Sequence, residues 1–119
     1  MPGPIVVGVG GGDSGREAAL AAARVAGLMG VPLILTFGYE ASAMAARGGA
    51  LTDELESIAE EVAGEVRALV AERFPDVSVE VELVLDRPVE ALIRVAEARG
   101  AEVIVVGHGG TGPLRAALL

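Results

Sequence analysis

Apolar runs alternate with helix-like stretches along most of the chain. Short runs rich in Val, Ile and Leu, bounded by glycine or polar residues, are typical of strands, and apolar residues three or four positions apart are typical of helices. The predicted strands are residues 4–9, 31–39, 77–85 and 101–107. The predicted helices are residues 14–29, 51–73 and 87–100, and a last one that begins after Gly112.

The first two helices have recognisable apolar faces and ends. Asp13 or Ser14 is a suitable N-cap for the first, and Gly30 a suitable residue just beyond its C-terminus. The apolar positions of the first helix are Ala18, Ala22, Val25 and Met29, and those of the second are Leu51, Leu55, Ile58, Val62, Val66 and Leu69. Glutamates occupy the opposite side of the second helix, which predicts a solvated surface there. The segment 40–50 between strand and helix is small and glycine-containing, and is predicted to be a mobile loop.

The order of the elements predicts an open, doubly wound parallel α/β sheet. Connections this short leave room only for crossover helices between parallel strands. In the third strand, Glu80 and Glu82 alternate with apolar residues, which is expected at an edge and not in a strand buried on both faces. The first and fourth strands are uniformly apolar and belong inside. The predicted strand order is therefore 3-2-1-4, with a topological switch between the first and fourth strands, where such sheets bind ligands.

Composition restricts the classes of function. A chain of 119 residues is expected to form one domain over residues 1–119. No run of about 18 apolar residues predicts a membrane span, and neither a secretory signal nor any cysteine is present, so a cytoplasmic protein is expected. The formal charge of −8 argues against binding to nucleic acid, because phosphate backbones require clustered cations. The basic residues are all arginines, so no lysine is available for a Schiff base or a Walker loop.

Two glycine-rich loops follow the two strands at the predicted switch. "GVGGGDSG" follows the first strand and "GHGGTG" follows the fourth. Glycine lets backbone N–H groups approach a phosphate, and the N-terminus of a following helix adds positive potential. The alternative is that short turns in a protein rich in small residues simply use glycine. His108, the only histidine, has no second metal ligand and no nucleophile partner in sequence, so neither a metal site nor a catalytic residue is predicted.

The whole chain resembles the universal stress protein family. The resemblance is carried by "IVVGVGGGDSGREAAL", "PLILTFGYE" and "RPVEALIRVAEARGAEVIVVGHGGTGPLRAALL". It implies a Rossmann-like fold of the adenine nucleotide alpha hydrolase type. Nucleotide-binding members carry G-x-x-G, nine residues and then G-[ST]; Gly107 and Gly110 match the first half, and the chain ends before the second. Members also commonly carry Asp at the end of the first strand, where this chain has Gly10.

The resemblance implies a small stress-response protein that binds ATP, accompanied by Mg²⁺, as a regulatory ligand. It is not expected to be an enzyme, and any ATP hydrolysis should be very slow. Binding is expected in the crevice between the first and fourth strands. The expected nucleotide-binding residues are Val9, Gly10, Gly38, Val106, Gly107, His108, Gly109, Gly110 and Thr111. The alternative is a dimeric interaction module of the same fold without a nucleotide site, which Gly10 and the missing G-[ST] favour.

The fourth strand, "VIVV", would be an exposed apolar edge in a four-stranded sheet. Such edges promote pairing with other chains. A fifth strand is therefore expected but missing, and family members use that strand in dimerisation. The sequence predicts a chain that is short at its C-terminal end and forms a homodimer through the side of the fourth strand.

Overall fold

The computed structural model describes residues 3–9, 13–39, 52–107 and 115–118. The strands are β1 (Ile5–Gly8), β2 (Leu33–Tyr39), β3 (Val79–Leu85), β4 (Val103–Val106) and β5 (Arg115–Leu118). The helices are α1 (Asp13–Met29), α3 (Thr52–Arg73) and α4 (Pro88–Arg99). The loop predicted at 40–50 lies outside the described residues.

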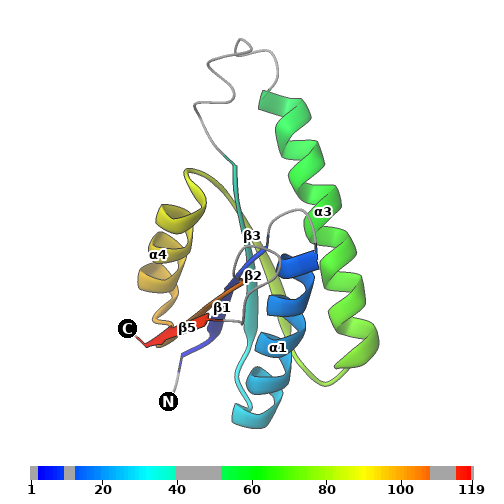
Figure 1. Cartoon of the computed structure of the whole chain (residues 1–119), viewed down its shortest axis with the longest axis vertical. Coiled ribbons are helices and arrows are strands. Elements are labelled where there is room, and N and C mark those ends of the chain that lie inside the picture. The colour runs from blue at the N-terminus through cyan, green and yellow to red at the C-terminus, as the bar shows by residue number, and fades with distance from the viewer. Residues whose placement is uncertain (1–2, 10–12, 40–51, 108–114, 119) are drawn as a thin grey trace.

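The sheet has the order β3-β2-β1-β4-β5. β1 pairs in parallel with β2 and with β4, and β2 pairs in parallel with β3. The predicted order 3-2-1-4 is thus confirmed, with β3 at an edge and the switch between β1 and β4. Helices α1 and α3 cover one face of the sheet and α4 covers the other (Figure 1).

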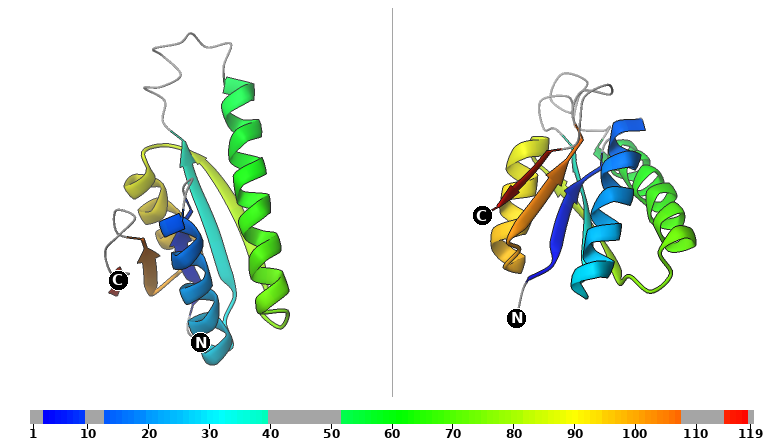
Figure 2. Two further views of the ribbon diagram at one scale, coloured as in Figure 1. Left: turned by 45° about the vertical axis from the view of Figure 1, so that its right-hand side comes forward. Right: turned by 60° about the horizontal axis from the view of Figure 1, so that its bottom comes forward.

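The end of the chain differs from the prediction. Residues Arg115–Leu118 form β5, which pairs antiparallel with β4, and not the beginning of a helix. Figure 2 shows β5 beside β4 at the edge of the sheet. Arg, Ala and Leu all favour helices, so local propensity predicted the wrong element. Pairing prevailed because β4 would otherwise present unpaired backbone groups. The expectation that the fifth strand is missing, and that β4 is an exposed edge, is therefore wrong.

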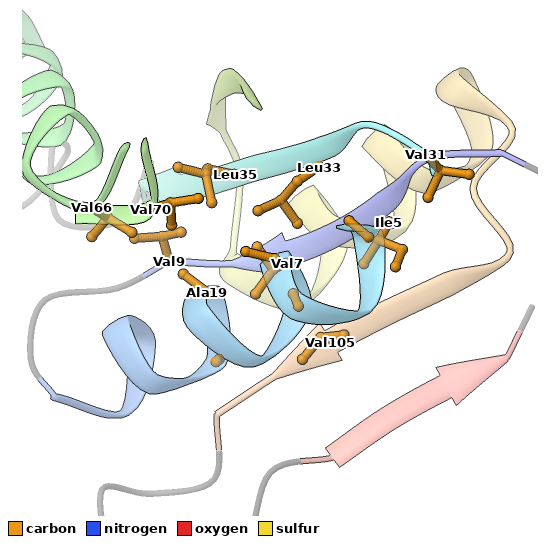
Figure 3. Close-up of a cluster of buried hydrophobic side chains, with 14 residues drawn as sticks. Ile5, Val7, Val9, Ala19, Val31, Leu33, Leu35, Val66, Val70 and Val105 are labelled. Carbon is orange, nitrogen blue, oxygen red and sulfur yellow. The ribbon is translucent and has the colours of Figure 1, made fainter. Parts of the chain in front are cut away.

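The main core lies between the sheet and the two helices α1 and α3. Ile5 and Val7 of β1, Val9 just after β1, and Leu33 and Leu35 of β2 point toward it (Figure 3). Helix α1 contributes only alanines to the fully buried set: Ala18, Ala19, Ala22, Ala23 and Ala26. Because alanine is small, α1 packs close to the strands, and the larger β-branched side chains of the sheet fill the space.

The buried faces of the helices include the predicted Ala18, Ala22 and Val66 but differ from the prediction at several larger side chains. On α3 the buried residues are Ala59, Ala63, Val66 and Val70. Ile58, predicted to be in the core, is 55% exposed, and Val25 and Met29 of α1 are 41% and 43% exposed. The larger side chains assigned to the apolar faces are partly exposed because the close contact between helix and sheet leaves room mainly for alanines.

Glycines end two helices where the backbone requires a left-handed conformation. Gly30 after α1 has φ +69° and Gly100 after α4 has φ +67°. Beyond each glycine, a backbone N–H bonds back into the helix, from Val31 to the Ala26 carbonyl at 3.0 Å and from Ala101 to the Ala96 carbonyl at 2.9 Å. The prediction that Gly30 ends the first helix is confirmed.

Ion pairs attach α4 to the edge strand. Arg99 contacts the carboxylates of Glu80 at 2.7 Å and Glu82 at 3.0 Å. The hydrogen bond to Glu80 raises the pKa of the Arg99 guanidinium above its ordinary value. The glutamates that identified β3 as an edge strand thus face α4 and meet its arginine. None of the described helices is long and apolar enough to cross a membrane.

Candidate functional site

A cavity of about 390 Å³ opens at the carboxyl ends of the strands. Gly8 and Val106 are the last residues of β1 and β4, and Gly38 is the residue before the end of β2. The described lining residues are Gly8, Val9, Ser14, Gly15, Thr36, Gly38, Val89, Leu92, Val106 and Gly107. The volume falls at the lower end of the range for small-molecule sites, and the position is the one that the topological switch favours.

The floor of the cavity belongs to the α4 face of the sheet. Alternate residues of a strand point to opposite faces, and Val6 and Ile34 pack in the cluster beneath α4. Gly8 and Thr36 follow them two residues later and are register partners across β1 and β2. The missing side chain at Gly8 leaves space beside Thr36, which makes room for a cavity where a larger residue would fill the floor.

Two of the glycines are constrained by close neighbours. A Cβ at Gly107 would lie 2.5 Å from the backbone oxygen of Ser14, so β4 and the first turn of α1 can approach only because residue 107 is glycine. A Cβ at Gly8 would lie 3.1 Å from Cδ1 of Leu92, a side chain that can shift. The close contact with Ser14 is therefore enough to explain why residue 107 is glycine. At residue 8 the absence of a side chain also enlarges the cavity.

The cavity has a polar backbone but no ionisable side chain among its described lining residues. Ser14 and Gly15 lie in the first turn of α1, and Val89 lies in the first turn of α4. The N-terminus of a helix presents unpaired N–H groups and the positive end of the helix dipole. Two such ends reach this cavity, so it offers a favourable place for an anionic group in a chain whose formal charge is −8.

Four of the predicted site residues lie together in the structure. Val9, Gly38, Val106 and Gly107 all line the cavity, although they come from three strands and the residues that follow them. Gly10, His108, Gly109, Gly110 and Thr111 lie outside the described residues. In the described ranges no group of three His, Asp or Glu side chains is placed to hold a metal ion.

The sequence analysis assigned to the site neither Ser14 and Gly15 at the start of α1 nor the residues from the α4 side of the cavity. Val89 and Leu92 come from a helix that no glycine motif marks. Thr36 had a signal that could have been used, because it is the only polar residue in the run "LILTF" of a buried strand. Gly8 could have been found by its alternation with the apolar residues of β1.

The strand order and the crossover helices place the chain among open, doubly wound α/β proteins, and a cavity lies at the topological switch of its sheet. A sequence model of the universal stress protein family matches residues 1–119, so the chain belongs to that family. The family resemblance noted in the sequence is thereby confirmed. No curated protein matches the chain in the comparison.

Solved structures share the fold. A universal stress protein from Archaeoglobus fulgidus is 25% identical with a TM-score of 0.74, and the match covers 95% of this chain and 81% of that one. Protein Rv1636 from Mycobacterium tuberculosis H37Rv is 25% identical with a TM-score of 0.68, covering 93% and 75%. A universal stress protein in complex with cAMP is 22% identical with a TM-score of 0.63, covering 86% and 69%.

Proposed function

We propose that this chain is a cytoplasmic stress-response protein that binds an adenine nucleotide, ATP, as a regulatory ligand. The observation that carries the proposal is the cavity of about 390 Å³ at the switch point, lined by Gly8, Val9, Gly38, Val106 and Gly107. Membership of the universal stress protein family supports it, as does the structure of a relative in complex with cAMP.

The lining suits the two chemical parts of a nucleotide. Val89, Leu92 and Val106 offer apolar surface to a base. The first turn of α1, at Ser14 and Gly15, offers backbone N–H groups to the phosphates, whose charge Mg²⁺ would partly neutralise. In this proposal Gly10 and residues 108–111 complete the site from the two loops.

The ligand is bound and not turned over in this proposal. The chain has no lysine to neutralise developing charge on a phosphoryl group, and the cavity lining holds no ionisable side chain among the described residues. Phosphate release from ATP by the purified protein should stay at the level of the buffer. Release that scales with protein concentration and vanishes in a cavity variant would contradict this.

Calorimetric titration of ATP with Mg²⁺ tests the proposal. We expect a saturable isotherm, and a charge placed at the cavity should weaken it. Val89 lines the cavity and is 63% exposed, so Val89→Glu should fold and replace apolar surface offered to the base by a carboxylate, lowering ATP affinity about tenfold. Ile93→Glu, one turn further along α4 at a residue 42% exposed and away from the lining, is the matched control and should bind as the wild type does.

A second candidate is an interaction module of the same fold that binds no nucleotide. It is favoured by Gly107, whose lack of a side chain is explained by the backbone of Ser14 without any ligand. Absence of heat at millimolar ATP would support this module and contradict nucleotide binding.

We further propose a homodimer formed through the outer edge of β5. β5 is the last strand on its side of the sheet, and a free strand edge can pair with a second copy. Sedimentation at increasing concentration should show a dimer. A monomer throughout the accessible concentration range would contradict it.

A further inference from the structure

Thr36 carries a buried hydroxyl that lacks a hydrogen-bond partner. The residue is 2% exposed and is the only buried polar side chain in the described part of the chain. Its Oγ1 has no hydrogen-bond partner among the described residues. Buried polar groups in folded proteins are paired in the large majority of cases, so this exception requires an explanation.

The backbone of Thr36 takes part in the pairing of the sheet. Its carbonyl oxygen accepts a hydrogen bond from the N–H of Val9 at 2.8 Å, which extends the pairing of β1 and β2 beyond Gly8. Only the hydroxyl remains unpaired, on the α4 face of the strand, and because its Oγ1 is itself buried, a ligand group reaches it when a flexible neighbour such as Leu92 shifts.

The surroundings of the hydroxyl connect it with the cavity. Thr36 is itself a lining residue, and its register partner Gly8 has no side chain to cover it. Gly38, two residues along β2 on the same face, leaves the next position open as well. The wall opposite is Leu92, an apolar side chain that offers no hydrogen bond.

Valine would fill this position with nearly the same shape and no desolvation cost. The neighbouring residues Leu33, Ile34 and Leu35 are all apolar and fully buried. An unpaired hydroxyl here destabilises the free protein, because it loses its hydrogen bonds to water and gains none in return. The cost of burying the hydroxyl is offset only when a polar group bound in the cavity forms a hydrogen bond with it.

We propose that Thr36 is the specificity-determining residue of the cavity, and that its hydroxyl hydrogen-bonds the polar edge of the bound base. This inference rests on the proposed function. A hydroxyl can donate and accept, so it suits either an amino group or a ring nitrogen of a purine.

Two substitutions and two readouts test the inference. Thr36→Val removes the hydroxyl and keeps the shape, and Thr36→Ser keeps the hydroxyl as the matched control. For Thr36→Val we expect the melting temperature without nucleotide to rise by about 3 °C or more. Calorimetry should show ATP affinity falling about tenfold in the same variant. Thr36→Ser should keep ATP affinity within about threefold of the wild type.

A residue that recognises the ligand should give a higher melting temperature and a lower ATP affinity in Thr36→Val. A residue with a purely structural role would not give this combination. ATP affinity unchanged in Thr36→Val would overturn the inference while leaving the proposed function intact. A lower melting temperature in Thr36→Val would also overturn it, because it would show that water or protein already satisfies the hydroxyl. Wild-type protein that binds no ATP would overturn the proposed function, and this inference with it.

Discussion

Strand β2 packs into the main core on one face and reaches the cavity on the other. Toward α1 and α3 the strand places Leu33 and Leu35, which are fully buried in the main core. Toward α4 it places Ile34, in a smaller cluster, and then Thr36 at the cavity. Because alternate residues of a strand face opposite ways, one strand supplies stability on one face and a binding surface on the other. Changes on the two faces should therefore have separable effects.

The largest effect on stability is expected on the packed face. Leu35→Ala removes a fully buried side chain from the main core and should lower the free energy of unfolding by about 3 kcal/mol. Urea unfolding measures this. ATP affinity of the folded protein should stay within about twofold of the wild type. A large loss of affinity with little loss of stability would contradict the division between the faces.

Next in size is a substitution where the cavity meets α1. In Gly107→Ala the new Cβ would lie 2.5 Å from the backbone oxygen of Ser14, so β4 and α1 must separate. We expect a loss of about 2 kcal/mol in the free energy of unfolding, together with weaker ATP binding.

Gly64→Ala is the matched control for this substitution. Gly64 is exposed within α3, and a Cβ there meets nothing within 4 Å. This variant should be more stable by about 0.5–1 kcal/mol, because alanine favours the helix. Equal effects of the two substitutions in urea unfolding would show that the contact with Ser14 does not constrain residue 107.

A smaller change on the cavity face should affect binding more than stability. Gly8→Ala brings a methyl group 3.1 Å from Cδ1 of Leu92, which can shift by a few tenths of an ångström. The free energy of unfolding should change by no more than about 1 kcal/mol. ATP affinity should fall about fivefold, because the methyl group narrows the floor beside Thr36. Calorimetry and a urea melt on the same sample compare the two effects.

The smallest effect is expected at Asp86, which follows β3. Arg94 donates a hydrogen bond to Asp86 at 2.9 Å and the backbone N–H of Arg87 donates another at 2.8 Å, and these lower the pKa of the carboxyl below 3.8. A lowered pKa stabilises the fold above pH 3.8, and this contribution is lost as the pH falls through the folded-state pKa. Asp86→Asn should thus melt slightly lower than the wild type at pH 7. This difference in melting temperature should disappear in acid. A difference that increased in acid would contradict the lowered pKa of Asp86.

The sequence predicted the topology more completely than the helix faces or the last strand. The glutamates of β3 correctly identified an edge, and uniform apolarity placed β1 and β4 inside. Ile58 was wrongly assigned to the core, since Ala59 makes the close contact with the sheet. Residues 115–118 favour a helix locally and became a strand because β4 needed a partner.

The residues of the candidate site that lie at glycine-marked strand ends were predicted from the sequence. The residues that α4 contributes were not. Val9, Gly38, Val106 and Gly107 follow from topology and motif, and the structure brings them to one cavity. Leu92 depends on how a helix packs across the sheet, which sequence periodicity does not specify. Thr36 became informative only once its burial and its lack of a partner were known.

Amide chemical shifts during titration with ATP and Mg²⁺ test most directly whether a ligand binds on the α4 face at the switch. We predict saturable changes at Gly8, Gly38, Val89 and Gly107. The amides of the outer turns of α3, across the sheet, should stay constant. Changes confined to α3, or no changes at millimolar ATP, would contradict the account.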